Sequence, residues 1–86
     1  MFHVYLLENL IDRSWYIGFT TNVERRLIEH NSKIGGEYTG KKAGGWKLIY
    51  YESYLDKNDA LGREKFLKSG SGRKFLRMQL KNYFEL

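Results

Sequence analysis

Residues 2–20, FHVYLLENLIDRSWYIGFT, decide the fold. Phe2 to Glu8 is a short stretch with aromatic and β-branched residues and apolar positions on both faces. This pattern predicts a strand that is covered on both sides, at the centre of a sheet. Asn9 to Arg13 is a polar turn, and Ser14 to Thr20 predicts a second strand. Because the connection is short, the two strands are expected to form an antiparallel hairpin.

The register of this hairpin decides whether its two tyrosines meet. We expect a turn centred between Leu10 and Ile11. In that register Tyr5 lies opposite Tyr16 on one face, with Cβ atoms about 5 Å apart. A slip by one residue would move one of the two to the other face. Gly18 shares the face of Tyr16, so it either lets a substrate approach the tyrosines or marks a bulge in the strand.

The rest of the chain predicts helices around one further strand. The expected order is a helix capped by Thr21 or Asn22, a glycine-rich loop, a strand, and two helices separated by a Gly-Ser break. The expected ranges are helix to Ser32, loop Ser32–Gly45, strand Trp46–Tyr54, helix Asp59–Lys68 and helix Gly72–Tyr83. The fold class is therefore α+β, a small three-stranded antiparallel sheet flanked by helices in the order β-β-α-β-α-α. Residues 1–86 are expected to form one domain.

The third strand is rich in aromatic residues, and three of them are spaced four residues apart. Trp46, Tyr50 and Tyr54 share one face if the strand is regular. Core packing is the favoured interpretation of this face, ahead of stacking on nucleic-acid bases.

Composition limits the classes of function. Fifteen Lys and Arg residues against ten Asp and Glu give a net charge of +5. This charge favours a polyanion such as nucleic acid, although a protein that is simply basic fits it equally well. Cysteine is absent, which excludes disulfides and thiolate metal sites. No apolar run approaches the roughly 20 residues of a membrane span, so we expect a cytoplasmic protein without membrane contact.

Two basic segments are candidates for contact with nucleic acid. Lys41 and Lys42 lie in the long glycine-rich loop, which either has a function or is a surface excursion. Arg73 and Lys74 follow Ser69–Gly72 at the start of the last helix. Free backbone N–H groups and two cations there can hold a backbone phosphate. A plain turn between helices is the favoured alternative.

Three further polar side chains are candidates for a role in catalysis, because each lies on or beside the apolar face of its helix. Arg26 and His30 are four residues apart and share one edge of the first helix. Glu64 is three residues from a leucine on either side, so it shares the apolar face of its helix. A carboxylate in that position is costly unless it is paired or binds a metal. An ion pair with Arg63 or Lys68 is favoured from spacing alone.

The most specific motif is Tyr16-Ile17-Gly18-Phe19-Thr20-Thr21, followed by Glu24-Arg25-Arg26-Leu27 and His30-Asn31. Together with Val4-Tyr5 and the Arg63-Glu64-Lys65 helix, it resembles the GIY-YIG nuclease superfamily. The likeness covers nearly the whole chain and is closest to small single-domain bacterial members related to the excinuclease nuclease module. The resemblance implies hydrolysis of a phosphodiester assisted by one divalent metal, Mg²⁺ or Mn²⁺.

The resemblance also implies roles for individual residues. Tyr5 and Tyr16 match the motif tyrosines, Arg26 the catalytic arginine, and Glu64 the glutamate that binds the metal. His30 matches a position that is often histidine or tyrosine. The general base stays open: the analogy favours Tyr5, whereas a reference pKa near 6.5 favours His30.

The first motif departs from the family pattern. His3 stands where the family usually has glycine, and its larger side chain could narrow the approach beside Tyr5.

The sequence therefore predicts a metal-dependent endonuclease that acts on nucleic acid, expected to be DNA, in repair or recombination. Because these 86 residues contain no separate DNA-binding domain, specificity is expected to be weak or to be supplied by a partner protein. The alternatives are a nucleic-acid-binding module with little or no catalysis and a protein-interaction domain.

Overall fold

The computed structural model describes residues 1–32 and 37–85. Its elements are, in chain order, β1 (Phe2–Asn9), β2 (Trp15–Thr20), α1 (Val23–Asn31), α2 (Glu37–Lys41), β3 (Trp46–Tyr54), α3 (Lys57–Lys68), α4 (Gly70–Gln79) and α5 (Lys81–Phe84). The predicted α+β class and element order are confirmed, with α2 and α5 as additional short helices. Within the described ranges, no helix is long and apolar enough to cross a membrane.

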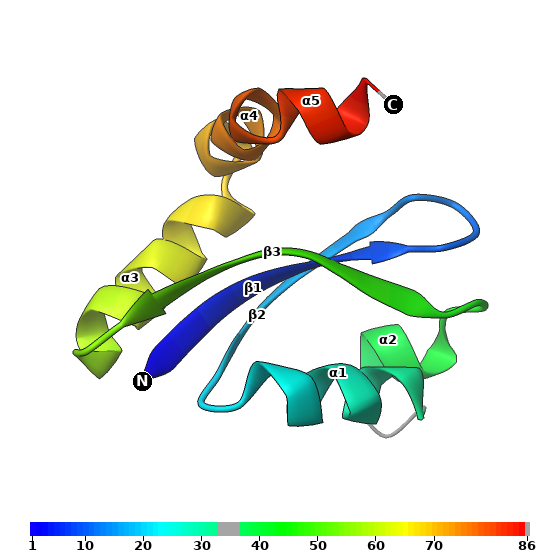
Figure 1. The fold of residues 1–86 in the computed structure, drawn as a ribbon, viewed down its shortest axis with the longest axis horizontal. Helices are drawn as coiled ribbons and strands as arrows, with labels where there is room; N and C mark the ends of the chain where they lie inside the picture. Colours follow the sequence, from blue (N-terminus) through cyan, green and yellow to red (C-terminus); the bar gives the residue numbers. More distant parts are fainter. Residues whose placement is uncertain (33–36, 86) are drawn as a thin grey trace.

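The sheet has the order β2-β1-β3, and both pairs are antiparallel. The predicted central position of the first strand is therefore confirmed. Figure 1 shows α1 and α2 on one side of the sheet and α3, α4 and α5 on the other. Each face of β1 is consequently covered, which explains why its residues are apolar without alternation.

The hairpin register differs by two residues from the expected one. Tyr5 lies opposite Gly18, and Tyr16 lies opposite Leu7. The reason is the turn, where the buried Asn9 side chain accepts hydrogen bonds from the backbone N–H groups of the two residues at positions 11 and 12. Arg13 closes the turn in the left-handed region, with φ 65°. Because a shift of two residues preserves the side-chain period, both tyrosines still share a face.

A bulge in β3 changes the faces of its aromatic residues. Leu6 pairs with Tyr50 and Leu7 with Leu48, so Ile49 is an extra residue. The extra residue reverses the alternation. The expected common face for Trp46, Tyr50 and Tyr54 is therefore wrong, although all three pack as predicted.

Two apolar clusters lie on opposite faces of the sheet. One contains Tyr5, Leu7 and Trp46, with Leu27 of α1 and Tyr16 packed against it. The other cluster contains the β1 and β2 residues that point to the opposite face, together with buried residues of α3 and α4. Its fully or nearly buried members are Val4, Leu6, Trp15, Ile17, Ala60, Leu67 and Leu76. The two tyrosines of the motif therefore lie on the side of α1.

The helix boundaries differ from the expected ranges in several places. Helix α3 begins at Lys57, two residues before the expected Asp59, because the Asp56 side chain caps it. The glycine-rich segment contains the short helix α2 and is not entirely a loop. The final helix begins at Gly70, two residues earlier than expected, because the Ser69 hydroxyl accepts a hydrogen bond from the N–H of Gly72 and caps it. It is also divided at Leu80, whose backbone (φ −105°, ψ 24°) is outside helical geometry.

Gly72 allows α4 to approach α3 closely, which predicts a stability effect. A Cβ at this position would lie against the carbonyl oxygen of Phe66 and 2.6 Å from its carbonyl carbon. Gly72→Ala should lower the free energy of unfolding by about 1–3 kcal/mol, because backbone atoms must shift. Chemical denaturation measures this change.

Gly62→Ala is the matched control. A Cβ at Gly62, in the middle of α3, would meet no atom within 4 Å. The substitution should raise the free energy of unfolding by about 0.5–1 kcal/mol through helix propensity. Equal effects of the two alanines would contradict the close approach at Gly72.

Candidate active site

The Tyr5 hydroxyl lies at the centre of the candidate site. Tyr5 comes from the central strand, and its residue surface is 2% exposed. Its hydroxyl forms a hydrogen bond of 2.8 Å with Nε2 of His30, which is in the last turn of α1. His30 is 0% exposed. The two polar groups therefore satisfy each other in the protein interior.

Thr39 completes this buried chain of hydrogen bonds. Its Oγ1 lies 2.6 Å from Nδ1 of His30, and its side chain comes from α2. The Thr39 carbonyl also accepts a hydrogen bond of 3.4 Å from Nε1 of Trp46. Sequence reasoning missed Thr39, because a five-residue helix among glycines has no apolar periodicity to reveal a buried position.

Burial decides the charge of His30. Desolvation, followed by the nearby Arg26 guanidinium, lowers the pKa of His30 to about 4. The imidazole is therefore neutral at pH 7, with one ring nitrogen donating and the other accepting. If Nδ1–H donates to Thr39, Nε2 is the acceptor for the Tyr5 hydroxyl.

Arg26 brings a permanent positive charge to the same hydroxyl. It lies one helical turn before His30, and its side chain interacts with the Tyr5 hydroxyl. Its Nη1 also forms an ion pair of 3.1 Å with Glu29. The predicted proximity of Arg26 and His30 is thus present, and both converge on Tyr5.

The pKa of Tyr5 is raised well above its ordinary value. Burial is the largest cause, and the neighbouring Tyr16 adds to it. Arg26 acts in the opposite direction but does not overcome burial, while the Glu64 carboxylate contributes a further increase. Tyr5 is therefore protonated at neutral pH in the protein without substrate.

Tyr16 and Gly18 shape the surface around Tyr5. The Tyr16 ring lies 4.8 Å from the His30 ring and 6.2 Å from the Tyr5 ring, measured between centroids. A Cβ at Gly18 would be 2.6 Å from Cζ of Tyr5. Gly18 thus makes room for the Tyr5 ring itself, which reaches across β2. The β1–β2 register is continuous past it, so the strand has no bulge there.

Glu64 lies on α3 and has an ion-pair partner. Its side chain is 20% exposed and forms a 2.9 Å pair with Lys68, one turn later. This is one of the two pairings considered from spacing; the other cation, Arg63, instead holds Glu52 at 2.8 Å and 3.0 Å. The Glu64 carboxylate is the smallest of the causes that raise the pKa of Tyr5.

Glu64 is the one acid that affects the pKa of Tyr5 among the described residues, and a single carboxylate suits a cation that takes few protein ligands. Within residues 1–32 and 37–85, no three His, Asp or Glu side chains come together as a metal site. Mg²⁺ retains several waters and is commonly held by one or two carboxylates together with substrate phosphates. Glu64 fits such a site as its carboxylate ligand. When no cation is bound, the ion pair with Lys68 compensates the charge of Glu64.

The basic residues expected to contact nucleic acid lie in different surroundings. Lys42 forms a 2.8 Å ion pair with Asp12 of the hairpin turn, and Lys41 is exposed at the end of α2. Arg73 lies over the Trp15 ring at 5.8 Å, whereas Lys74 is exposed on α4.

His3 does not occupy the space beside Gly18. Its Nδ1 is 2.7 Å from the hydroxyl oxygen of Ser53, and its ring packs edge-on against Tyr51. Both partners belong to β3, on the opposite side of β1 from β2. The histidine at position 3, where the family usually has glycine, therefore does not narrow the space around Tyr5 on the β2 side.

Asn31 has a structural role that the motif alone did not reveal. Its amide donates to the Trp46 carbonyl at 3.0 Å, and its Oδ1 accepts from the Trp46 N–H at 2.7 Å. This pair of bonds attaches the end of α1 to the start of β3. His30 is consequently held at the correct depth for Tyr5.

The lowered pKa of His30 predicts a pH dependence of stability. The unfolded chain takes up a proton near pH 6.5, and the folded protein only near pH 4. Between these values the unfolded state binds more protons, so the free energy of unfolding should fall as pH is lowered from 6.5 to 4. His30→Gln should remove this part of the slope in denaturation curves.

His3→Gln is the matched control for that measurement, because His3 is not part of the buried chain. It should retain the wild-type slope between pH 4 and 6.5. A slope that persists in His30→Gln would show that His30 is protonated equally in both states.

The chain is similar to known proteins in sequence and in fold. The model of the GIY-YIG catalytic domain matches residues 1–78. A UPF0213 protein of Clostridium perfringens is 40% identical over 68 residues, which are 79% of this chain and 71% of that protein. A UPF0213 protein of Limosilactobacillus reuteri is 41% identical over 73 residues, 84% of this chain and 75% of that protein.

One solved structure is also similar. The solution NMR structure of a UPF0213 protein from Bacillus halodurans has 37% sequence identity and a TM-score of 0.54. The match covers 91% of this chain and 82% of that chain. With its strands, its helices and its paired tyrosines in place, the chain belongs to the GIY-YIG catalytic domain family, a family of nucleases.

Proposed function

We propose that residues 1–86 form one nuclease domain, an endonuclease that hydrolyses phosphodiester bonds in nucleic acid, with DNA as its substrate. Membership of a nuclease family supports the reaction class. The observation that carries the proposal is the buried Tyr5 hydroxyl, which hydrogen-bonds Nε2 of His30 at 2.8 Å and interacts with the Arg26 guanidinium one turn earlier on the same helix. On the family likeness alone, we place the activity in DNA repair or recombination, with a partner protein supplying specificity.

Arg26 is proposed to bind the reacting phosphate. Its guanidinium is always charged and presents a planar set of donors that matches phosphate oxygens. Its side chain is 29% exposed, and its partner in the resting state is Glu29 on the same helix. A substrate phosphate can replace Glu29 as the partner of the Arg26 guanidinium. The positive charge of Arg26 then stays next to Tyr5, where negative charge develops in the transition state.

Tyr5 is proposed as the general base, with His30 behind it. His30 is fully buried and so reaches the substrate only through the tyrosine. With Nδ1–H donating to Thr39, Nε2 can accept the Tyr5 proton as the phenol takes one from the attacking water. The raised pKa of Tyr5 means that this proton shift needs the substrate complex.

Glu64 is proposed to hold one divalent cation, Mg²⁺ or Mn²⁺. When bound, such a cation polarises a phosphate oxygen and stabilises the charge that develops on it. Lys68, released from Glu64, remains beside Tyr16 and can contact the substrate backbone. Tyr16, which lines the same pocket as Lys68, is proposed to orient the phosphate.

Substitution of the central groups tests this function. Tyr5→Phe and Glu64→Gln should each lower the rate of cleavage of branched, single-stranded or duplex DNA by about 100-fold or more. EDTA should have the same effect on the wild type, and Mg²⁺ should restore its activity. Rates are measured by gel electrophoresis of end-labelled DNA.

Tyr51→Phe and Asp59→Asn are the matched controls. Tyr51 is an exposed tyrosine of β3, and Asp59 is an exposed acid of α3. Both variants should cleave like the wild type. If the wild type binds DNA but cuts none of these substrates with Mg²⁺ or Mn²⁺, the protein is a nucleic-acid-binding module instead.

A further inference from the structure

A groove leads away from the candidate site along the edge strand β2. We call it the Trp15 groove, because Trp15 lines each of its three adjoining pockets of about 410, 260 and 540 Å³. The first pocket also contains Tyr16 and Lys68, so it begins at the candidate site. The second shares Arg73 with the first and Arg77 with the third.

Two arginines of α4 are held over Trp15. The guanidinium of Arg77 lies 4.8 Å from the ring centroid, and that of Arg73 lies 5.8 Å from it. Trp15 itself stacks on Phe84 at 5.4 Å. Among the residues that the structure describes, neither arginine has an acidic partner within ion-pair distance. Their charges are therefore oriented by an aromatic ring and not neutralised, as a site for an anion requires.

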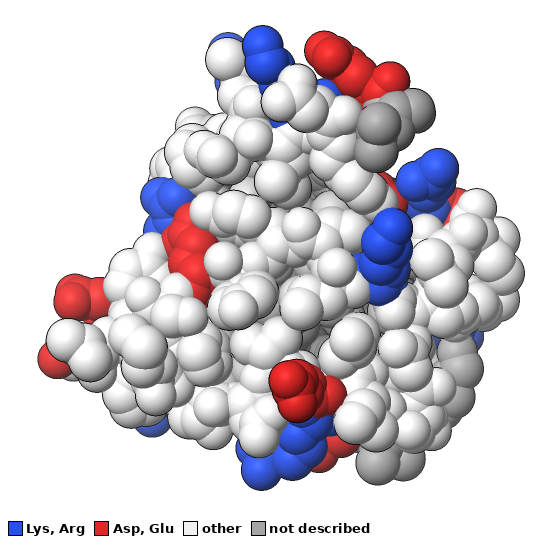
Figure 2. Space-filling view, in the orientation of Figure 1, with Lys and Arg blue, Asp and Glu red and all other residues white. Residues whose placement is uncertain are grey.

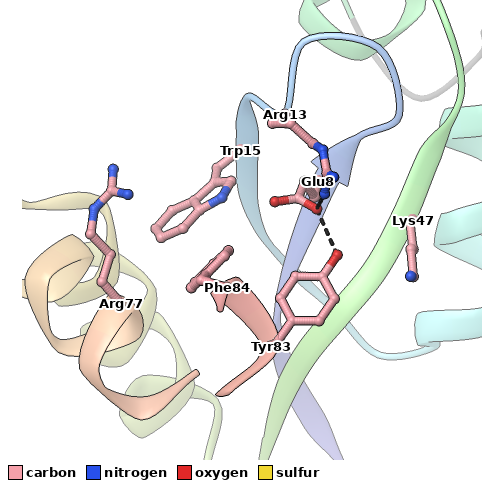
Figure 3. A pocket seen from close by; sticks show the side chains of 7 residues that line it. All are labelled: Glu8, Arg13, Trp15, Lys47, Arg77, Tyr83 and Phe84. Atoms are coloured by element: carbon pink, nitrogen blue, oxygen red, sulfur yellow. Dashed lines mark hydrogen bonds and ion pairs between the residues drawn. The ribbon is translucent and has the colours of Figure 1, made fainter. Parts of the chain in front are cut away.

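The third pocket contains a buried acid with one open oxygen (Figure 3). Glu8 is 4% exposed, and its Oε1 accepts hydrogen bonds from the Tyr83 hydroxyl at 2.6 Å and from Arg13 at 3.1 Å. Its Oε2 accepts no hydrogen bond from any described residue, yet it is not sealed from solvent. An acceptor of this kind suits an N–H donor on a flat ligand, because Tyr83, Phe84 and Trp15 provide aromatic walls.

We propose that the Trp15 groove binds an unpaired strand of nucleic acid next to the cleaved phosphate. Backbone phosphates contact Arg73 and Arg77, and one base enters the third pocket with its amino group on Oε2 of Glu8. The proposal rests on the proposed nuclease function and names its substrate class, a nucleic acid with a single-stranded segment. Cytosine suits the pocket, since a carboxylate accepts from its exocyclic N4.

The shape of the third pocket, and the charges on the face seen in Figure 2, favour a strand over a duplex. A base can enter the third pocket, with its ring between the aromatic walls, only when it is unstacked and out of the duplex. On the face seen in Figure 2, basic side chains stand in small separate groups, several of them beside acids, and form no broad basic surface. The Trp15 groove instead combines cations with aromatic rings, the combination typical of single-strand binding.

Binding in EDTA tests the groove separately from cleavage. Glu64→Gln protein is titrated into a 12-nucleotide oligo(dC) and into a duplex of equal length, and fluorescence anisotropy gives the dissociation constants. We expect tighter binding of the strand. Trp15 fluorescence should change on binding because Trp15 lines the groove, whereas Trp46 belongs to the apolar cluster on the other face of the sheet and should contribute a constant signal.

Arg77→Ala, added to Glu64→Gln, should weaken oligo(dC) binding roughly tenfold and reduce the salt dependence by about one phosphate contact. The matched control is Lys57→Ala, which removes the same charge at the start of α3 and should change affinity less than twofold. Thermal melting confirms that both variants are folded. Equal losses in the two variants, or equal affinity for strand and duplex, would overturn the proposal.

Glu8→Gln tests the base pocket. Because Arg13 and Tyr83 both donate to Oε1, the amide oxygen should take that place and leave the NH₂ group facing the pocket. We expect a preference for oligo(dC) over oligo(dT) of roughly three- to tenfold, and its loss or reversal in the variant. An unchanged preference would refute the role of Glu8.

These outcomes separate the groove from the nuclease activity. If the wild type does not cleave but Arg77→Ala weakens strand binding, the nuclease function fails and the groove stands. If the wild type cleaves and Arg77→Ala binds normally, the groove fails and the nuclease function stands.

Discussion

The hydrogen-bonded chain from Tyr5 through His30 to Thr39 joins β1, α1 and α2 at the centre of one face of the sheet. All three side chains are at most 2% exposed, so none of them can exchange its partner for bulk water without opening the core. These hydrogen bonds therefore fix how far α1 approaches the sheet. It also places Arg26, one turn before His30, against the same hydroxyl.

The edge strand β2 serves two surfaces because its side chains alternate. Tyr16 points toward α1 and contacts His30, whereas Trp15 lies on the opposite face and supports the arginines of α4. The candidate site and the Trp15 groove therefore meet at neighbouring residues of one strand. A strand of nucleic acid bound in the groove would pass directly beside Tyr16, so binding and cleavage would share one continuous path.

Much of this arrangement was predictable from short-range patterns. The strands, the central position of β1 and the common face of Tyr5 and Tyr16 follow from side-chain alternation, which a two-residue error in register does not disturb. The common face expected for Trp46 and Tyr50 failed, because one bulged residue reverses the alternation and leaves no clear signal in the sequence. Thr39 was missed for a related reason, since its short helix is defined by its tertiary contacts.

The sequence by itself determined the family, the class of fold and which residue types could act on a phosphodiester, because these depend on local spacing and chemical identity. Only the tertiary structure decided that His30 is neutral and that the pKa of Tyr5 is raised, since desolvation depends on what the whole fold packs around them. It also decided that Glu64 pairs with Lys68 and that Glu8 keeps one oxygen open. Such partners come from separate turns and elements, and the distances between them are set by packing and not by spacing along the chain.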